Sequence, residues 1–170
     1  VSAGSPSNNT TYAYDSSGEN FYGPRTAIAQ LPTTSQWNNV SLTNSIRAIT
    51  NENGLNTITG RTLPSNFNYS EYAARLLTIQ EIKQATGNNN IPTYNDGELD
   101  NFTYLIENTK FASNSNPAWA WWLENALSYD SAYAWNVNGN DRFVYRTTVS
   151  NTDDHGVRPA IEVSKTNIEY

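Results

Sequence analysis

The alternation of side chains between residues 118 and 163 restricts the fold more than any other feature of the chain. In residues 133–138 and 143–149, aromatic and β-branched side chains recur at every second position. Because successive side chains of a β-strand point to opposite faces of a sheet, this period predicts half-buried strands. Asn138 and Gly139 both tolerate a positive φ, which favours a tight turn. We therefore predict a hairpin of residues 133–138 with 142–149, then a loop over 150–156 and a returning strand over 157–163.

Tryptophan is concentrated in the same region. Four of the five tryptophans are Trp119, Trp121, Trp122 and Trp135. Large aromatic side chains on alternating strands usually contribute to a core, so we expect Trp122 and Trp135 to be buried. Trp119 is the best candidate for an exposed side chain that stacks on a sugar.

Two helices are predicted upstream of the tryptophans. Residues 78–86 begin with a capping box, in which Thr78 and Glu81 satisfy each other's backbone amides, and Gly87 ends the helix. Residues 41–51 place Leu42, Ile46 and Ile49 at helical spacing. Shorter elements are predicted nearby: a loop with a short strand over 56–69, a strand over 72–77, and a helix over about 98–108.

Four segments in this order resemble a known family: Ala-Arg-Leu-Leu-Thr-X-X-Glu-Ile (74–82), Trp-Trp-Leu (121–123), Ala-Trp-X-Val with its Asn-Gly turn (134–139), and Gly-Val-Arg-Pro-Ala-Ile (156–161). The arrangement resembles the C-terminal domain of many bacterial surface and pilin-like proteins over residues 70–165. That domain is similar to the C-type-lectin-like fold of formylglycine-generating enzymes and of the variable proteins of diversity-generating retroelements. The resemblance implies an α+β, C-type-lectin-like fold, with two main helices packed on a twisted, mainly antiparallel sheet.

The length and composition are consistent with one exported domain. We expect residues 1–11 to be a flexible polar tether and residues 12–170 to form a single domain. Ten Lys and Arg against 16 Asp and Glu leave a net charge of −6, and the scattered basic residues argue against nucleic acid as a partner. Polarity comes mainly from neutral side chains, since 25 residues are Asn. We expect an extracellular location at a bacterial cell surface, with any signal or anchor preceding Val1.

The hairpin and its neighbouring loops carry the candidate binding residues. In the resembling variable proteins this region presents the ligand surface, and Tyr with Asn combines contact area with adaptable hydrogen bonding. The predicted ligand-binding residues are Glu124, Asn125, Ser128, Tyr129, Tyr133, Asn136, Asn138, Asn140, Arg142 and Tyr145. The expected function is noncatalytic adhesion to a protein or glycan on a host or neighbouring cell, and the first alternative is a structural subunit that contacts other filament subunits.

Catalytic and metal-dependent functions are weaker alternatives. The chain has no Cys, so the cysteine chemistry of formylglycine-generating enzymes is missing, and disulfides and thiolate zinc sites are excluded. A hydrolase would need His155, the only histidine, with Asp154 and a serine, but His155 is more simply a loop residue. Oxygen ligands cluster at 95–100 and at Asp141, Asp153 and Asp154, without the spacing of an EF-hand. We predict no metal and no cofactor.

Arg158 lies within the predicted returning strand. A charged side chain on a central strand needs a partner, so we expect an ion pair of Arg158 with Glu81 or Glu162.

Overall fold

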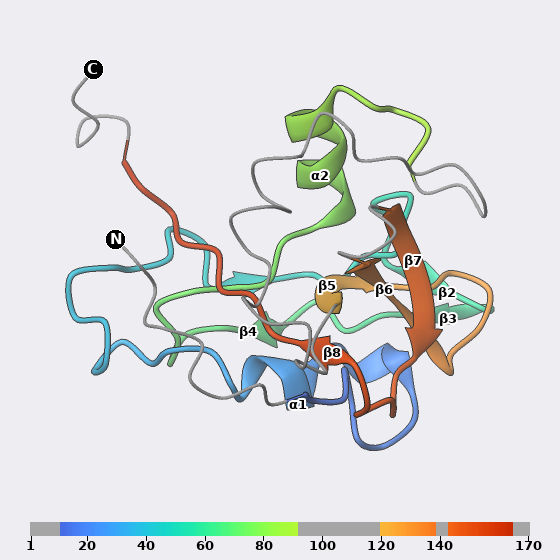
Figure 1. The fold of residues 1–170 in the computed structure, drawn as a ribbon, viewed down its shortest axis with the longest axis horizontal. Coiled ribbons are helices and arrows are strands. Elements are labelled where there is room, and N and C mark those ends of the chain that lie inside the picture. The colour runs from blue at the N-terminus through green and yellow to red at the C-terminus, as the bar shows by residue number, and fades with distance from the viewer. Residues whose placement is uncertain (1–10, 92–119, 139–142, 165–170) are drawn as a thin grey trace.

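The computed structural model describes residues 11–91, 120–138 and 143–164. These ranges form a mixed α+β fold with a few helices and a curled central sheet (Figure 1), which confirms the expected fold class at that level. The helices are η1 (Asn20–Tyr22), α1 (Arg25–Ile28) and α2 (Ile79–Thr86). The strands are β1 (Ile46–Arg47), β2 (Thr57–Ile58), β3 (Arg61–Thr62), β4 (Phe67–Asn68), β5 (Ala120–Ala126), β6 (Tyr133–Asn138), β7 (Phe143–Thr148) and β8 (His155–Gly156).

The central sheet has the strand order β7-β6-β5-β8. β6 pairs antiparallel with both β5 and β7, whereas the short β8 runs parallel to β5. The β6–β7 pairing confirms the predicted hairpin over the described residues; Gly139 of its turn lies outside them. β5 and β6 are the two inner strands, and every residue of β5 is buried. Two small antiparallel sheets, β1–β4 and β2–β3, complete the strand pairing.

The two faces of the central sheet pack on different parts of the chain. On one face, Trp121, Trp135 and neighbouring aliphatic side chains pack against Ile79 and Ile82 of α2. On the other face, Trp122 packs with the N-terminal segment and α1. Figure 1 accordingly shows α2 and α1 on opposite sides of the sheet. Trp122 and Trp135 are both buried, as predicted.

Helix α2 forms where the sequence predicts it, because its ends are specified locally. The Thr78 hydroxyl accepts a hydrogen bond from the Glu81 amide at 3.2 Å, and the Glu81 carboxylate accepts one from the Thr78 amide at 2.8 Å. Gly87 ends the helix in the left-handed conformation with φ +70°. These interactions confirm the capping box and the predicted boundaries.

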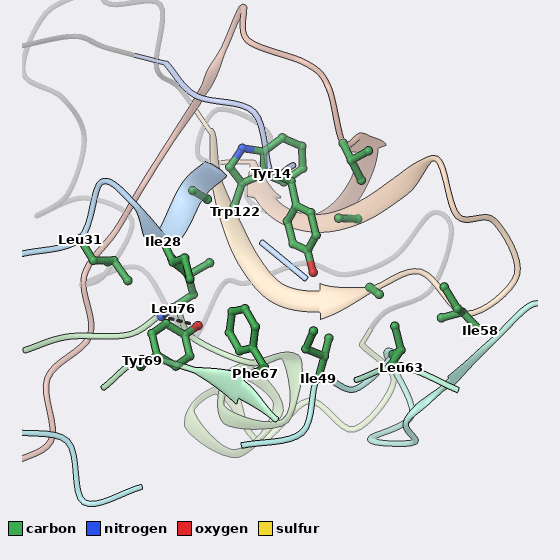
Figure 2. Packing of buried hydrophobic residues seen from close by; sticks show 14 residues of the cluster. Tyr14, Ile28, Leu31, Ile49, Ile58, Leu63, Phe67, Tyr69, Leu76 and Trp122 are labelled. Atoms are coloured by element: carbon green, nitrogen blue, oxygen red, sulfur yellow. Dashed lines mark hydrogen bonds between the residues drawn. The ribbon is translucent and has the colours of Figure 1, made fainter. Parts of the chain in front are cut away.

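The larger core cluster surrounds Trp122 and Tyr14, whose rings meet edge to face at 5.6 Å. Figure 2 shows Phe67, Tyr69 and the aliphatic side chains of the 49–76 region packed beside β5 in the same cluster. Most of these side chains come from irregular segments or two-residue strands. Tertiary packing on β5 and scattered backbone hydrogen bonds between loops therefore hold these segments in place, rather than extended strands or helices.

The helix predicted over residues 41–51 was wrong. Only Ile46 and Arg47 are regular there, and they form β1 against β4. Ile46 is 58% exposed while Ile49 is buried, so the apolar positions do not share one helical face. In this strand, the Arg47 guanidinium lies 3.1 Å from the Glu124 carboxylate of β5. The spacing of apolar residues along the sequence cannot predict this ion pair, because Glu124 is distant in the chain.

Two predicted strands are also absent as continuous elements. In 72–77, Tyr72 and Arg75 each make one isolated bridge, to Thr33 and to Ala160. In 157–163 only Ala160 is bridged, and the sheet pairing instead uses β8, two residues earlier. Neither segment extends these isolated bridges into a ladder with a neighbouring strand. Within 56–69, strands β2, β3 and β4 confirm the expectation of a loop with short strand structure.

Some predictions lie outside the described residues. These are residues 1–10 of the tether predicted over 1–11, the ligand cluster at 95–100, the helix over 98–108, Trp119, Asn140, Asp141 and Arg142. Among the described residues, no helix has the length and apolar character needed to cross a membrane.

We expect Trp122→Ala to lower the free energy of unfolding by about 3–5 kcal/mol, because it removes a fully buried aromatic side chain. Chemical denaturation of wild type and variant checks this. An unchanged unfolding midpoint would contradict the assignment of Trp122 to the core.

We expect Gly23→Ala to be more destabilising than Gly18→Ala by about 1–3 kcal/mol, the usual range for overpacking a core. Both glycines have nearly the same positive φ, +81° and +82°, so the cost of backbone strain is matched. A Cβ at Gly23 would lie 2.5 Å from Ile49 Cδ1, whereas nothing lies within 4 Å of a Cβ at Gly18. Equal melting temperatures for the two variants would show that the packing around Gly23 is looser than described.

Candidate functional site

The ten predicted binding residues do not form one surface. Asn140 and Arg142 lie outside the described residues. Glu124, Asn125, Asn136 and Asn138 are buried, so the expectation that they lie on an exposed face was wrong. The other four divide between two sides of the sheet.

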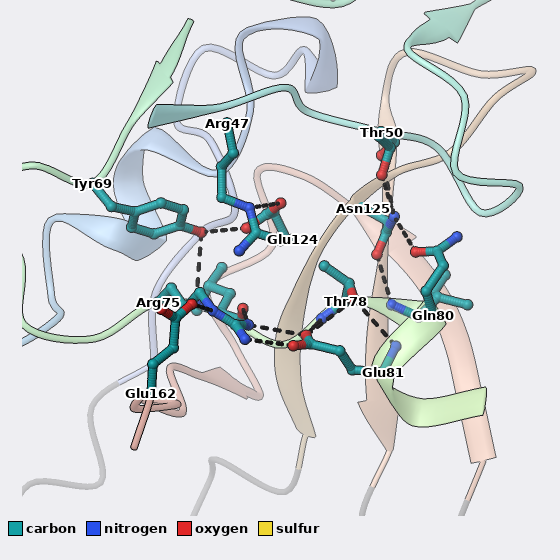
Figure 3. Close-up of polar contacts among 12 residues, drawn as sticks. Arg47, Thr50, Tyr69, Arg75, Thr78, Gln80, Glu81, Glu124, Asn125 and Glu162 are labelled. Atoms are coloured by element: carbon teal, nitrogen blue, oxygen red, sulfur yellow. Dashed lines mark hydrogen bonds and ion pairs between the residues drawn. The ribbon is translucent and has the colours of Figure 1, made fainter. Parts of the chain in front are cut away.

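Glu124 is part of the structural core. Its carboxylate binds Arg47 at 3.1 Å and accepts a hydrogen bond from the Tyr69 hydroxyl at 2.9 Å (Figure 3). Its backbone carbonyl accepts a hydrogen bond from the Tyr14 hydroxyl at 2.7 Å. Burial raises the pKa of Glu124, and the Arg47 guanidinium opposes that shift. Glu124 thus joins β5 to three distant segments and is not available to a ligand.

Asn125 joins β5 to the start of α2 and to the loop before β2. Its Oδ1 accepts a hydrogen bond from the Ile79 amide at 2.8 Å, which satisfies a backbone donor in the first turn of α2. Its Nδ2 donates to the carbonyl of Asn51 at 2.9 Å and to the Thr50 hydroxyl at 3.0 Å. Figure 3 shows this amide between Thr50 and Gln80. Its role is therefore structural.

The ion pair expected for Arg158 is made by Arg75 instead. Arg75 is buried and binds both Glu81 and Glu162, the two carboxylates that the sequence suggested for Arg158 (Figure 3). The Arg158 guanidinium lies over the ring of Trp121 at 4.3 Å, and burial lowers the pKa of Arg158 to about 10. Spacing along the sequence could not distinguish the two arginines, because both carboxylates reach the site through the tertiary fold.

Ser128, Tyr129 and Tyr133 lie together near one end of the sheet. The Ser128 amide donates to the buried carboxylate of Glu52 at 2.9 Å, which fixes the loop. Tyr129 is 56% exposed, and its hydroxyl accepts a hydrogen bond from Arg146. The Arg146 guanidinium also lies 5.6 Å from the ring of Tyr133. We call Tyr129, Tyr133 and Arg146 the tyrosine–arginine cluster.

The opposite face of β6 and β7 forms a hollow of about 360 Å³. The strand register explains which side chains meet there, because Asn136 is opposite Tyr145 and Asn138 is opposite both Phe143 and Ala120. Ala120 is in turn opposite His155 of β8. The described lining residues are Ala120, Asn136, Asn138, Phe143, Tyr145, Thr147, Asp154 and His155. Three of the predicted binding residues, Asn136, Asn138 and Tyr145, are therefore brought together.

The hollow combines amide and hydroxyl groups with aromatic rings. Asn136 Nδ2 donates to the Thr147 hydroxyl at 3.0 Å, which orients the amide across the strand pair. Tyr145 is 41% exposed, and its ring meets that of Phe143 edge to face at 5.4 Å. Concave sites with a few convergent polar groups among apolar walls are the usual form of ligand pockets.

His155 contributes to the hollow from β8 and is not the loop residue that we expected. It is only 2% exposed, and its ring stacks on that of Trp122 at 4.2 Å. Its Nδ1 contacts the Asp154 carboxylate, although not in the orientation of a directional hydrogen bond, and its Nε2 is buried without a hydrogen-bond partner. Burial lowers the pKa of His155, and the Asp154 carboxylate opposes the shift.

Sequence reasoning missed His155, Asp154 and Thr147 as members of the hollow. The only sequence feature that could have indicated the first two is an isolated Asp-His pair directly before a strand-forming segment. Nothing in the sequence shows that this pair aligns with Ala120, because the pairing of β8 with β5 joins distant segments.

The described ranges contain no group of three or more His, Cys, Asp or Glu side chains placed to hold a metal ion. Of the suggested calcium ligands, Asp154 contacts His155, while the backbone amide of Asp153 donates to Asn151 Oδ1 at 2.7 Å in a turn.

Comparison with protein-family models, with curated proteins and with solved structures found no match for this chain. The resemblance to C-type-lectin-like domains therefore rests on the sequence segments themselves.

We expect His155 to titrate below its ordinary pKa of about 6.5. Because the folded pKa is lowered, the unfolded chain binds the proton first on acidification. The contribution of His155 to stability is then complete above about pH 6.5 and declines as the pH falls toward the folded pKa. Nuclear magnetic resonance titration gives the pKa directly, since His155 is the only histidine. Asp154→Asn should lower this pKa further, and a pKa above 6.5 in the wild type would contradict the burial argument.

Proposed function

We propose that this chain is a noncatalytic ligand-binding domain that mediates adhesion, with the hollow on the β6–β7 face as its binding site. The observation that carries the proposal is the convergence of Asn136, Asn138 and Tyr145 with His155 at one concave surface. Their side chains can form hydrogen bonds in a site that also has aromatic walls. This combination suits recognition of a polar group on a protein or glycan.

The hollow is a better candidate than the tyrosine–arginine cluster. In that cluster the Tyr129 hydroxyl already accepts a hydrogen bond from Arg146. Tyr145 is half exposed beside the hollow, and within the described chain its hydroxyl makes no hydrogen bond. A partner can therefore contact both the ring and the hydroxyl of Tyr145 without breaking an existing interaction. Tyrosines of this kind often dominate binding energy.

The arrangement of His155 supports a binding function over a hydrolytic one. A hydroxyl nucleophile needs a histidine base within hydrogen-bond distance. Among the described residues His155 makes no such bond to a hydroxyl, and its contacts are with Asp154 and Trp122. The absence of Cys also removes the nucleophile that formylglycine-generating enzymes use.

A C-type-lectin-like domain at a bacterial cell surface is the context that we propose for this function. Its support is the order of the four resembling segments and the mixed α+β fold with its mainly antiparallel, curled sheet. The acidic, Asn-rich composition without Cys is compatible with an exported bacterial protein.

We expect Tyr145→Ala to reduce adhesion by about tenfold or more, because it removes an aromatic contact beside the hollow. The change in unfolding free energy should stay below about 1 kcal/mol, since Tyr145 is substantially exposed. Binding to a glycan array and to whole cells, each with a melting curve, provides the measurement.

Tyr129→Ala is the matched control, because Tyr129 is an exposed tyrosine on the other side of the sheet. It should retain adhesion. Full adhesion by a stable Tyr145→Ala variant would reject the hollow as the binding site. Loss of adhesion by Tyr129→Ala alone would transfer the function to the tyrosine–arginine cluster. Wild type that binds no surface but forms filaments would favour the structural-subunit alternative.

A further inference from the structure

The unpartnered nitrogen of His155 indicates what kind of group the hollow accepts. Its Nε2 is buried and makes no hydrogen bond, although buried polar groups are nearly always paired in folded proteins. Leaving such a group unpaired opposes folding. The ring cannot easily turn away, since Trp122 stacks against it at 4.2 Å. A group that enters the hollow and pairs with Nε2 would remove this penalty.

The contact with Asp154 determines whether Nε2 donates or accepts. A carboxylate next to Nδ1 favours the neutral tautomer that carries its proton on Nδ1. Burial lowers the pKa of His155 and thus keeps the ring neutral near pH 7. Nε2 is then an acceptor, so its complement on a ligand must be a hydrogen-bond donor.

The surrounding groups favour a donor with positive charge. The amide NH₂ of Asn136 is used by Thr147, which leaves its carbonyl oxygen as the group that can face a ligand. Asp154 adds a carboxylate to the lining, and its Oδ1 is the atom that contacts His155 Nδ1. The rings of Phe143 and Tyr145 offer faces that attract cations. No Lys or Arg is among the described lining residues, and the whole chain carries a net charge of −6.

We propose that the hollow binds a small organic cation with a primary ammonium group, which donates a hydrogen bond to His155 Nε2, while the Asp154 carboxylate on the Nδ1 side of the ring supplies a nearby counter-charge. This inference rests on the proposed binding function and specifies its ligand chemistry. A buried ammonium needs both a counter-charge and acceptors for its three N–H groups. Asp154 supplies the charge, and His155 with the Asn136 carbonyl supplies acceptors. A neutral alcohol would gain only one of these contacts, and a carboxylate would be repelled.

The experiment is a titration of nitrogen-15-labelled protein with n-propylammonium chloride, followed through the ring nitrogens of the single histidine. Matched titrations use 1-propanol, sodium propionate and sodium chloride, which separate charge, hydrogen bonding and ionic strength. We expect a saturable shift of the Nε2 resonance with propylammonium, and about tenfold weaker or no binding for 1-propanol and propionate. The absence of a saturable shift with propylammonium, or an equal response to 1-propanol, would overturn the assignment.

Asp154→Asn tests the charge while keeping His155 and the shape of the hollow. We expect it to weaken propylammonium binding by about tenfold or more, because it removes the counter-charge. Asp153→Asn is the matched control, since the exposed Asp153 does not line the hollow and its loss should leave binding unchanged. Equal affinity of the Asp154→Asn variant and wild type would exclude Asp154 as the counter-charge. If propylammonium fails to bind while Tyr145→Ala still abolishes adhesion, only the ligand class is wrong. If propylammonium binds but Tyr145→Ala adheres normally, the cation site stands and the adhesion site lies elsewhere.

Discussion

Two adjacent polar side chains on the fully buried strand β5 hold much of the described structure together. Glu124 joins the strand to Arg47 and Tyr69, and Asn125 joins it to the first turn of α2 and the loop around Thr50. Buried charge and amide groups are costly unless they are fully paired, so these contacts tolerate few alternative arrangements. The short strands and irregular segments between β1 and α2 are thereby ordered although they form little regular structure of their own.

Buried amides explain why a chain with so much Asn folds compactly. Asn20 Nδ2 donates to the carbonyls of Leu127 and Asp130 in the loop between β5 and β6, at 3.1 and 3.0 Å, and to that of Tyr133 at the start of β6, at 2.6 Å. Asn51 Nδ2 donates to the carbonyl of Thr57 at 2.8 Å, and its Oδ1 accepts from the amide of Asn53 at 2.8 Å. Backbone groups in loops need partners once they leave water, and an amide supplies both donors and an acceptor. Amide side chains can therefore order many loops in the described ranges although few residues of the chain are charged.

The alternation of side chains along the strands predicts only part of the candidate site. Alternation correctly placed Asn136 and Asn138 on one face of β6 and Trp135 on the other. It did not show that Asn136 and Asn138 would be buried, because burial depends on the β8 segment and its neighbours. Tyr145 could be predicted as part of a binding face, but His155 could not. The histidine reaches the hollow through a parallel pairing that no sequence pattern of β8 specifies.

The sequence by itself determined the elements whose causes are local: helix α2 through the Thr78–Glu81 capping box, and the β6–β7 hairpin through its side-chain period. It also determined that Trp122 and Trp135 would be buried. Only the tertiary structure decided that residues near Ile46 form a strand, that Arg75 binds the carboxylates expected for Arg158, and that β8 completes the sheet. Capping and alternation act between residues a few positions apart. The other outcomes depend on which distant segments the fold brings together.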